Sequence, residues 1–222
     1  DRLRAGKFAA WPPDFWTDAP GITLCPEKET GKFRVEIAAD VPPGPHLVRL
    51  FNASGASAPR FLLVATTPPL AEVEPNDEPA RAQPVTSLPA VITGRLAKVG
   101  DVDGYALELA AGQAFTATLD AQVIASPVDA VLRLLDPRGV EVAFNHDNGR
   151  NPDPLLTYAA QAAGRHVLQV FGFAHPATAD VRLHGSDAAV YILKLTPGQP
   201  PPASLPAAEG VVVPPDGAPN AP

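Results

Sequence analysis

Short stretches of alternating polar and apolar residues, each closed by a turn rich in proline or glycine, recur along this chain of 222 residues. Residues 32–37, Lys-Phe-Arg-Val-Glu-Ile, are a clear example, and Asp-Val-Pro-Pro-Gly at residues 40–44 follows them as a turn. Such alternation is typical of a half-buried strand. The 28 prolines, against 17 glycines and 6% aromatic residues, also fit short strands separated by turns better than packed helices. The sequence therefore predicts an all-β fold.

Residues 1–67 predict a small immunoglobulin-like β-sandwich. Its strands are expected at residues 32–37, 46–52 and 60–65. Because a complete sandwich of that kind has about seven strands in about 100 residues, we expect this one to be incomplete, with its first strands missing or supplied by the second domain. Residues 1–18 show no regular pattern, and their aromatic and proline cluster at residues 11–16 is expected to cover a sheet edge or to anchor the chain to a surface.

Residues 68–196 predict a second β-sandwich, of the jelly-roll type, in which strand candidates follow one another without helical periodicity. These candidates lie at residues 90–96, 103–109, 114–119, 131–135, 140–144, 155–158, 164–171 and 190–195. A short stiff joint at residues 66–70, with two adjacent prolines, precedes them. Residues 197–222 hold nine prolines in 26 positions, which predicts a linker or disordered tail because no apolar face is available for burial.

Two acidic segments in the second part form a candidate metal site. Their oxygen-bearing side chains are Glu72, Glu74, Asn76 and Asp77 in the first segment and Asp101 and Asp103 in the second. Because alternate side chains of an extended strand share one face, each segment would present its oxygens to one side. The two segments would then close around Ca²⁺, an ion that takes about 6 to 8 oxygen ligands. The alternative is an acidic interdomain linker whose charges are only solvated.

A series of short motifs accompanies the acidic segments in a fixed order. The motifs are Glu-Val-Glu-Pro-Asn-Asp at 72–77, Gly-Arg-Leu at 94–96, Gly-Asp-Val-Asp at 100–103, Ala-Gly-Gln at 111–113, Ser-Pro-Val-Asp-Ala-Val-Leu at 126–132, Asp-Pro-Arg-Gly at 136–139, Ala-Gly-Arg-His-Val at 163–167 and Tyr-Ile-Leu at 191–193. In these motifs the second part resembles the bacterial pre-peptidase C-terminal domain, a calcium-dependent jelly-roll module of secreted proteases and collagenases.

This resemblance implies that the family's calcium ligands fall on the six residues of the two acidic segments, with backbone carbonyls near Gly94 and Arg95 completing the shell. The collagen-binding members of the family space the later aspartates slightly differently from the Asp-x-Asp seen at Asp101 and Asp103. The resemblance also implies that calcium fixes the amino-terminal linker against the sandwich and stiffens the joint with the preceding domain.

The arrangement of an immunoglobulin-like part that runs directly into this module, through residues 43–50 and 72–77, resembles large secreted proteins of planctomycete-type bacteria. It implies an extracellular or cell-envelope location in a bacterium, where the chain acts as a rigid spacer, adhesion or targeting unit. The implied partners are the other domains of the same polypeptide and an extracellular polysaccharide or protein polymer.

Charge and hydropathy narrow the classes of partner. The net charge of −7 and pI near 5.1, without a basic stripe, argue against a nucleic-acid partner. No stretch approaches the roughly 18 apolar residues of a membrane span, so membrane insertion is not expected. The amino end lacks the apolar core of a signal peptide, and if the chain was cut from a longer secreted protein we expect the signal upstream. The single cysteine, Cys25, is expected to be a small buried hydrophobe.

Motifs of enzyme chemistry are not recognisable in the sequence. None of the five histidines belongs to an H-E-x-x-H motif, and no serine lies in G-x-S-x-G. We therefore expect a non-catalytic accessory module, and regard part of a secreted hydrolase as less favoured. A second oxygen-rich loop, residues 145–153, is expected to be a plain hairpin loop, with a second cation site as the alternative.

The runner-up function is a carbohydrate- or collagen-binding module that uses exposed aromatic rings on one sheet face. The candidate rings are Tyr105, Phe171, Phe173 and Tyr191. Core packing is the favoured interpretation of the same rings, and their surface exposure separates the two interpretations.

Overall fold

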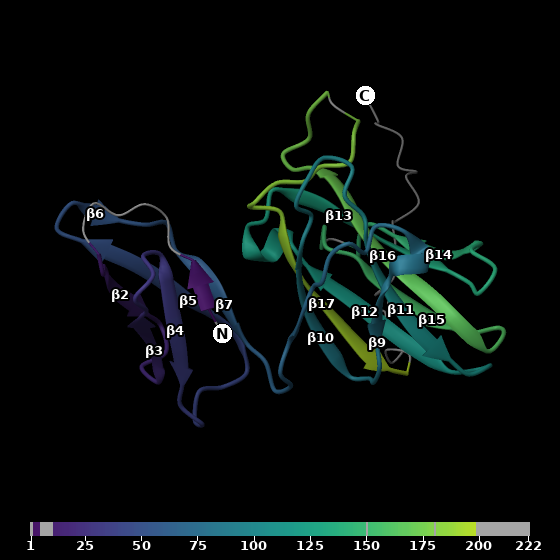
Figure 1. Ribbon diagram of the computed structural model, residues 1–222, viewed down its shortest axis with the longest axis horizontal. Helices are drawn as coiled ribbons and strands as arrows, with labels where there is room; N and C mark the ends of the chain where they lie inside the picture. Colours follow the sequence, from purple (N-terminus) through teal and green to yellow (C-terminus); the bar gives the residue numbers. More distant parts are fainter. Residues whose placement is uncertain (1, 5–10, 150, 180, 199–222) are drawn as a thin grey trace, which may run out of the picture.

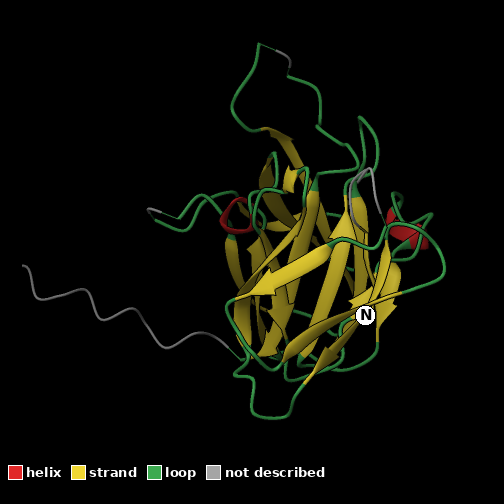
Figure 2. Cartoon of the chain, turned by 90° about the vertical axis from the view of Figure 1, so that its left-hand side faces the viewer, coloured by secondary structure: helices red, strands yellow, loops and turns green. Residues whose placement is uncertain are grey.

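The computed structural model describes residues 2–4, 11–149, 151–179 and 181–198 (Figure 1). Within these residues the chain forms seventeen strands and two short 3-10 helices, η1 (Pro79–Arg81) and η2 (Gln122–Ile124) (Figure 2). The predicted all-β class is therefore confirmed. The described residues contain no helix with the length and apolar character needed to cross a membrane.

The first part of the chain forms two small antiparallel sheets. One has the order β1-β4-β3, and in the other β5 pairs with β2, β6 and β7. The strands are β1 (Arg2–Arg4), β2 (Asp14–Thr17), β3 (Ile22–Pro26), β4 (Lys32–Ile37), β5 (Gly44–Asn52), β6 (Gly55–Ala56) and β7 (Arg60–Val64). The strands expected at 32–37, 46–52 and 60–65 are confirmed, whereas the expectation that residues 1–18 lack regular structure is wrong where β1 and β2 lie.

A hydrophobic core of its own lies between these two sheets. Ile22, Leu24 and Phe33 from β3 and β4 pack against Val48 and Leu62 from β5 and β7. The first part therefore has two layers, as a sandwich does. Its immunoglobulin-like character and the chain division at residue 67 remain predictions.

The second part is a sandwich of two five-stranded sheets, as predicted. The sheet orders are β15-β12-β17-β10-β8 and β14-β13-β16-β11-β9. The strands are β8 (Leu70–Ala71), β9 (Gln83–Val85), β10 (Ala90–Arg95), β11 (Asp103–Leu109), β12 (Ala114–Asp120), β13 (Val128–Leu135), β14 (Glu141–Asn145), β15 (Leu155–Ala159), β16 (Gly164–Ala174) and β17 (Val190–Pro197). All eight strands expected from the sequence are present, and the two short strands β8 and β9 add parallel edges.

The core of this second sandwich lies between its sheets. Ile92, Phe115 and Leu193 of one sheet and Leu107 and Leu168 of the other are almost completely buried in a single cluster. Each such side chain contributes about 1.5–3 kcal/mol of transfer free energy. Burial of these apolar side chains between the sheets therefore supplies the main driving force for the second sandwich.

Tyrosines of the predicted aromatic strip belong to this core and not to an exposed face. Tyr105 is 0% and Tyr191 1% exposed. Phe171 is also buried, beneath the Arg133 guanidinium, which lies 5.0 Å from the ring centroid. The favoured interpretation, core packing, is therefore confirmed for these three rings, and the alternative of an exposed ligand-binding strip is wrong for them, because they lie at positions that the sheets cover. Phe173, at the end of β16, remains partly exposed.

The oxygen-rich loop at residues 145–153 is built around a buried carboxylate. Asp153 accepts hydrogen bonds from the backbone amides of Ala121, Gln122 and Val123, at 2.8–3.1 Å. Because these bonds satisfy both carboxylate oxygens at the start of η2, Asp153 has a structural role.

The prediction of a tail at 197–222 falls on residues that, beyond Gly198, lie outside the described part of the chain.

Candidate metal centre

The first acidic segment is attached to the second sandwich by backbone hydrogen bonds. β8 pairs in parallel with β10, and the amide of Glu72 extends this pairing by donating to the carbonyl of Thr93 at 3.0 Å. Farther along, the carbonyl of Asn76 accepts from the amide of Gly104 in β11 at 3.2 Å. A Cβ on Gly104 would lie 2.8 Å from that carbonyl oxygen, so the close approach requires glycine. The segment therefore crosses from one sheet of the sandwich to the other.

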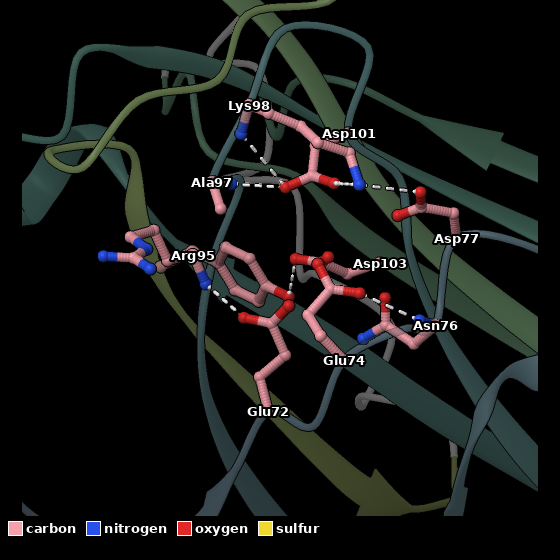
Figure 3. A network of polar contacts seen from close by, with 10 residues as sticks. Glu72, Glu74, Asn76, Asp77, Arg95, Ala97, Lys98, Asp101 and Asp103 are labelled. Atoms are coloured by element: carbon pink, nitrogen blue, oxygen red, sulfur yellow. Dashed lines mark hydrogen bonds and ion pairs between the residues drawn. The ribbon is translucent and has the colours of Figure 1, made fainter.

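Three carboxylates converge where the segment passes the start of β11. Oxygens of Glu72, Glu74 and Asp103 all lie within 4.8 Å of one another, and Figure 3 shows these side chains pointing toward a common point. Glu72 Oε2 accepts from the backbone amide of Arg95 at 2.7 Å. Glu72 Oε1 and Asp103 Oδ1 are buried without a hydrogen-bond partner. We call this group of carboxylates the first cluster.

A second cluster adjoins the first and shares Glu74 with it. Oxygens of Glu74, Asp77 and Asp101 also lie within 4.8 Å of one another. Asp101 is completely buried, and its Oδ2 accepts from the backbone amides of Ala97 and Lys98. Asp77 Oδ1 and Asp101 Oδ1 are buried and accept no hydrogen bond. The structure thus brings all five predicted carboxylates into two neighbouring groups.

Asn76, the sixth predicted residue, lies beside both clusters (Figure 3). Its side chain is completely buried, and neither Oδ1 nor Nδ2 has a hydrogen-bond partner. An unpaired buried amide costs about 1–3 kcal/mol, and almost all buried polar groups in folded proteins are paired. The oxygen of Asn76 is therefore a natural ligand for a cation between the segments.

Burial and charge crowding perturb the ionisation of the clusters. Burial, together with the neighbouring Glu72, raises the pKa of Asp103 to about 9. Burial also raises the pKa of Glu72. The hydrogen bond from Lys98 lowers the pKa of Asp77. Like-charged carboxylates at this spacing favour protonation or a bound cation, and a cation is the partner that lets all of them ionise.

A pair of tyrosines supports the first cluster from inside the sandwich. Tyr191 of β17 donates a hydrogen bond of 2.5 Å to Asp103 Oδ2, and its hydroxyl also lies 2.5 Å from that of Tyr105. Gly94, the register partner of Tyr191 on β10, leaves room for the ring, because a Cβ there would lie 2.3 Å from it. With Oδ2 held in this way, Asp103 turns its unpaired Oδ1 toward the cluster.

The donor set fits a hard divalent cation. At this centre the buried acceptors without a hydrogen bond are all oxygens, from Glu72, Asn76, Asp77, Asp101 and Asp103, and Asp101 Oδ1 lies 3.4 Å from the ammonium of Lys98. Zinc prefers nitrogen and sulfur ligands, whereas Ca²⁺ takes about 6 to 8 oxygens in flexible geometry and Mg²⁺ keeps several waters. The residues present therefore fit calcium best.

Sequence reasoning missed the roles of Tyr191 and Lys98 at this centre and the packing of Gly94 against the Tyr191 ring. Tyr191 and Gly94 meet only because β10 and β17 are neighbours in the sheet, and Lys98 reaches the second cluster from a loop. The backbone of Arg95 was expected to offer a carbonyl near the metal, and the structure shows its amide donating to Glu72. The spacing of the motifs carried no signal for these contacts, which depend on strand pairing.

Comparisons with known proteins return similar solved structures. Neither a protein-family model nor a curated protein matches the chain. The periplasmic inhibitor of g-type lysozyme, PliG, from Aeromonas hydrophila is 15% identical over 59% of this chain and 100% of its own, with a TM-score of 0.37. The pre-peptidase C-terminal domain of a Bacillus anthracis collagenase is 16% identical over 60% and 100%, with a TM-score of 0.36. The secreted serine protease VesC of Vibrio cholerae is 13% identical over 89% and 43%, with a TM-score of 0.33.

Proposed function

We propose that this chain is a non-catalytic, calcium-stabilised accessory module of a secreted bacterial protein. The observation that carries the proposal is the set of buried oxygens without a hydrogen-bond partner on Glu72, Asn76 and Asp103, where the two acidic segments meet. Buried acceptors without donors are costly, and Ca²⁺ is the partner that satisfies them together.

The cation would be held between the two acidic segments. Glu72, Glu74 and Asp103 would bind it at the first cluster, with Asn76 as an amide ligand. When bound, calcium supplies positive charge and oxygen coordination and no redox chemistry. Because Asp103 and the acidic segment meet only in the folded chain, the free energy of metal binding adds to the free energy of folding.

The mechanical consequence concerns the connection between the two sandwiches. Residues 65–69, with Pro68 and Pro69, link β7 to β8, and the acidic segment begins directly after β8. Without a cation, repulsion between the carboxylates of the two segments favours release of the acidic segment from β11. With calcium bound, the segment is fixed and the connection to the first sandwich is shortened and stiffened. This supports the role of a rigid spacer in a multidomain extracellular protein.

A second candidate function is a carbohydrate- or protein-polymer-binding module. The exposed aromatic rings that favour it lie on the first sandwich and not on the second, where they were expected. Trp16, Phe51 and Phe61 are exposed on β2, β5 and β7. The register places Trp16 opposite Arg49 and Phe61 opposite Leu47 on β5, so these rings share the outer face of one sheet. Affinity electrophoresis in polysaccharide-containing gels tests this candidate, because Trp16→Ala would abolish any retardation that the wild-type protein shows.

Thermal unfolding with calcium and with EGTA tests the main proposal. Binding to the folded state alone raises the free energy of unfolding by about 2.7 kcal/mol at a ligand concentration of 100 Kd, so calcium is expected to raise the melting temperature by several degrees. Glu74→Gln should abolish the shift, and Glu141→Gln, an exposed glutamate of β14, serves as the matched control. An identical melting temperature in calcium and EGTA for the wild-type protein would refute the proposal.

A further inference from the structure

The second cluster already contains a positive charge of the protein's own. The Nζ of Lys98 lies 2.9 Å from Asp77 Oδ2 and 3.4 Å from Asp101 Oδ1. Figure 3 shows the lysine side chain folded over the two aspartates. Lys98 is held at its base as well, because its backbone amide donates to Asp101 Oδ2. The ammonium group therefore lies where a cation bound by Asp77 and Asp101 would lie.

The first cluster differs in this respect. The groups that donate hydrogen bonds to Glu72 and Asp103 in the described part of the chain are the backbone amide of Arg95 and the hydroxyl of Tyr191. Both are uncharged donors. The guanidinium of Arg95 is directed to Asp187, at 3.0 Å. A cation can therefore enter the first cluster without displacing a charged side chain.

The side chain of Lys98 can leave the second cluster, but while it stays it has an advantage over a divalent cation. Its side chain is 60% exposed and can turn into solvent, whereas Asp101 is fixed by burial. The ammonium of Lys98 contacts both aspartates of the second cluster, Asp77 at 2.9 Å and Asp101 at 3.4 Å. Since Lys98 is tethered in the same loop as Asp101, three residues before it, the effective concentration of its ammonium at the second cluster is high. A divalent cation has to displace it or accept repulsion at close range.

We propose that Lys98 is a built-in competitor for a second cation, so that the two clusters fill in order as calcium rises. The first cluster binds calcium directly, and the second binds it only when Lys98 swings out. This inference rests on the proposed calcium function and adds a regulatory step to it: the module has a tight structural centre and a weaker centre that responds to higher calcium.

Calorimetric titration of the metal-free full chain with calcium chloride tests the competition. In Lys98→Gln the second binding step is expected to tighten at least about tenfold, while the first changes by less than about threefold. Lys98→Arg keeps the charge and should behave like the wild-type protein. Lys28→Gln removes an exposed lysine of the first part and controls for net charge. Circular dichroism of each metal-free variant confirms that it is folded.

The outcomes separate this inference from the proposed function. Two calcium ions that bind wild-type and Lys98→Gln protein with the same affinities would overturn the competition and leave the calcium function intact. A single calcium ion bound by both proteins would also overturn it, because the second cluster would then not be a cation site. If neither protein binds calcium, both the inference and the proposed function fail.

Discussion

Tyr191 donates a hydrogen bond to Asp103 across the interior of the second sandwich, from one sheet to the other. Asp103 is the completely buried residue of the first cluster, and this bond connects it to the packed core. Residues that orient a metal ligand in this way commonly change metal affinity by about 10–100-fold when they are removed. The core and the metal centre are therefore expected to be energetically coupled.

Tyr191→Phe removes this donor and keeps the ring. We expect the calcium affinity to fall at least about tenfold. We expect the metal-free protein to lose about 1–3 kcal/mol, because the buried hydroxyl of Tyr105 also loses a partner. Calorimetry and urea unfolding measure the two effects. Tyr158→Phe, which changes a partly buried tyrosine of β15, is the matched control. Unchanged calcium affinity in Tyr191→Phe would show that the hydrogen bond does not position Asp103.

Gly94→Ala places a methyl group 2.3 Å from the Tyr191 ring. The ring or the β10 backbone has to move, which is expected to cost about 1–3 kcal/mol and to weaken calcium binding. In the double variant Gly94→Ala, Tyr191→Leu, the clash is relieved, so the two costs should be less than additive. Urea unfolding of the four proteins measures this coupling. Strict additivity would contradict the close packing of Gly94 against Tyr191.

Calcium binding is expected to release a proton at neutral pH. Burial raises the pKa of Asp103 from its ordinary value of 3.8 to about 9, so the metal-free protein holds this proton at pH 7 and the calcium complex does not. Titrations in buffers with different ionisation enthalpies should give roughly one proton released per calcium ion bound. Asp103→Asn should release none. A binding enthalpy that is independent of the buffer would contradict this prediction.

The raised pKa of Asp103 also makes the free energy of unfolding of the metal-free protein depend on pH. Since the folded pKa of Asp103 is raised, its contribution to stability is complete below pH 3.8 and is lost as the pH rises toward about 9. In EGTA, the free energy of unfolding should therefore fall over this window, and Asp103→Asn should flatten the fall. Chemical unfolding at a series of pH values measures it. An equal pH slope in the two proteins would exclude Asp103 as the group responsible.

Asp153 provides a test of the oxygen-rich loop at residues 145–153. Its carboxylate accepts three backbone amide hydrogen bonds from the start of η2. Asp153→Ala leaves these donors unpaired and is expected to cost about 1–3 kcal/mol without changing the number of calcium ions bound. Urea unfolding and calorimetry give both values. A loss of one calcium ion in this variant would instead support a cation site in the loop.

The sandwich of the second part was predictable because apolar residues recur at every second position along several of its strands. Leu107 and Leu109 on β11, or Leu193 and Leu195 on β17, recur at every second position and are buried together. Tyr105 and Tyr191 continue the same alternation, so the pattern favoured core packing for them. The first strands were harder to recognise, because prolines at positions 12, 13, 20 and 26 interrupt the alternation around β2 and β3.

The acidic segments were predictable as a site, whereas the contacts that support them were not. Carboxylates two positions apart, such as Glu72 and Glu74, predict a common cation site within one extended segment. The contact between Asp103 and Tyr191 depends on which strands face each other across the core. The position of Lys98 depends on the path of the loop after β10, which places its ammonium beside Asp77, 21 residues earlier. Such long-range geometry is set by tertiary packing and leaves no local pattern.

The central claim is that calcium fixes the acidic segment to the second sandwich, and amide hydrogen exchange tests it most directly. In calcium, protection should rise at the amides of Glu72, Asn76, Arg95 and Gly104, which lie in or against the segment. Protection along β5 of the first sandwich should stay the same. Because exchange reports local opening, equal protection of the four amides in calcium and in EGTA would contradict the account, while their selective protection in calcium would establish it.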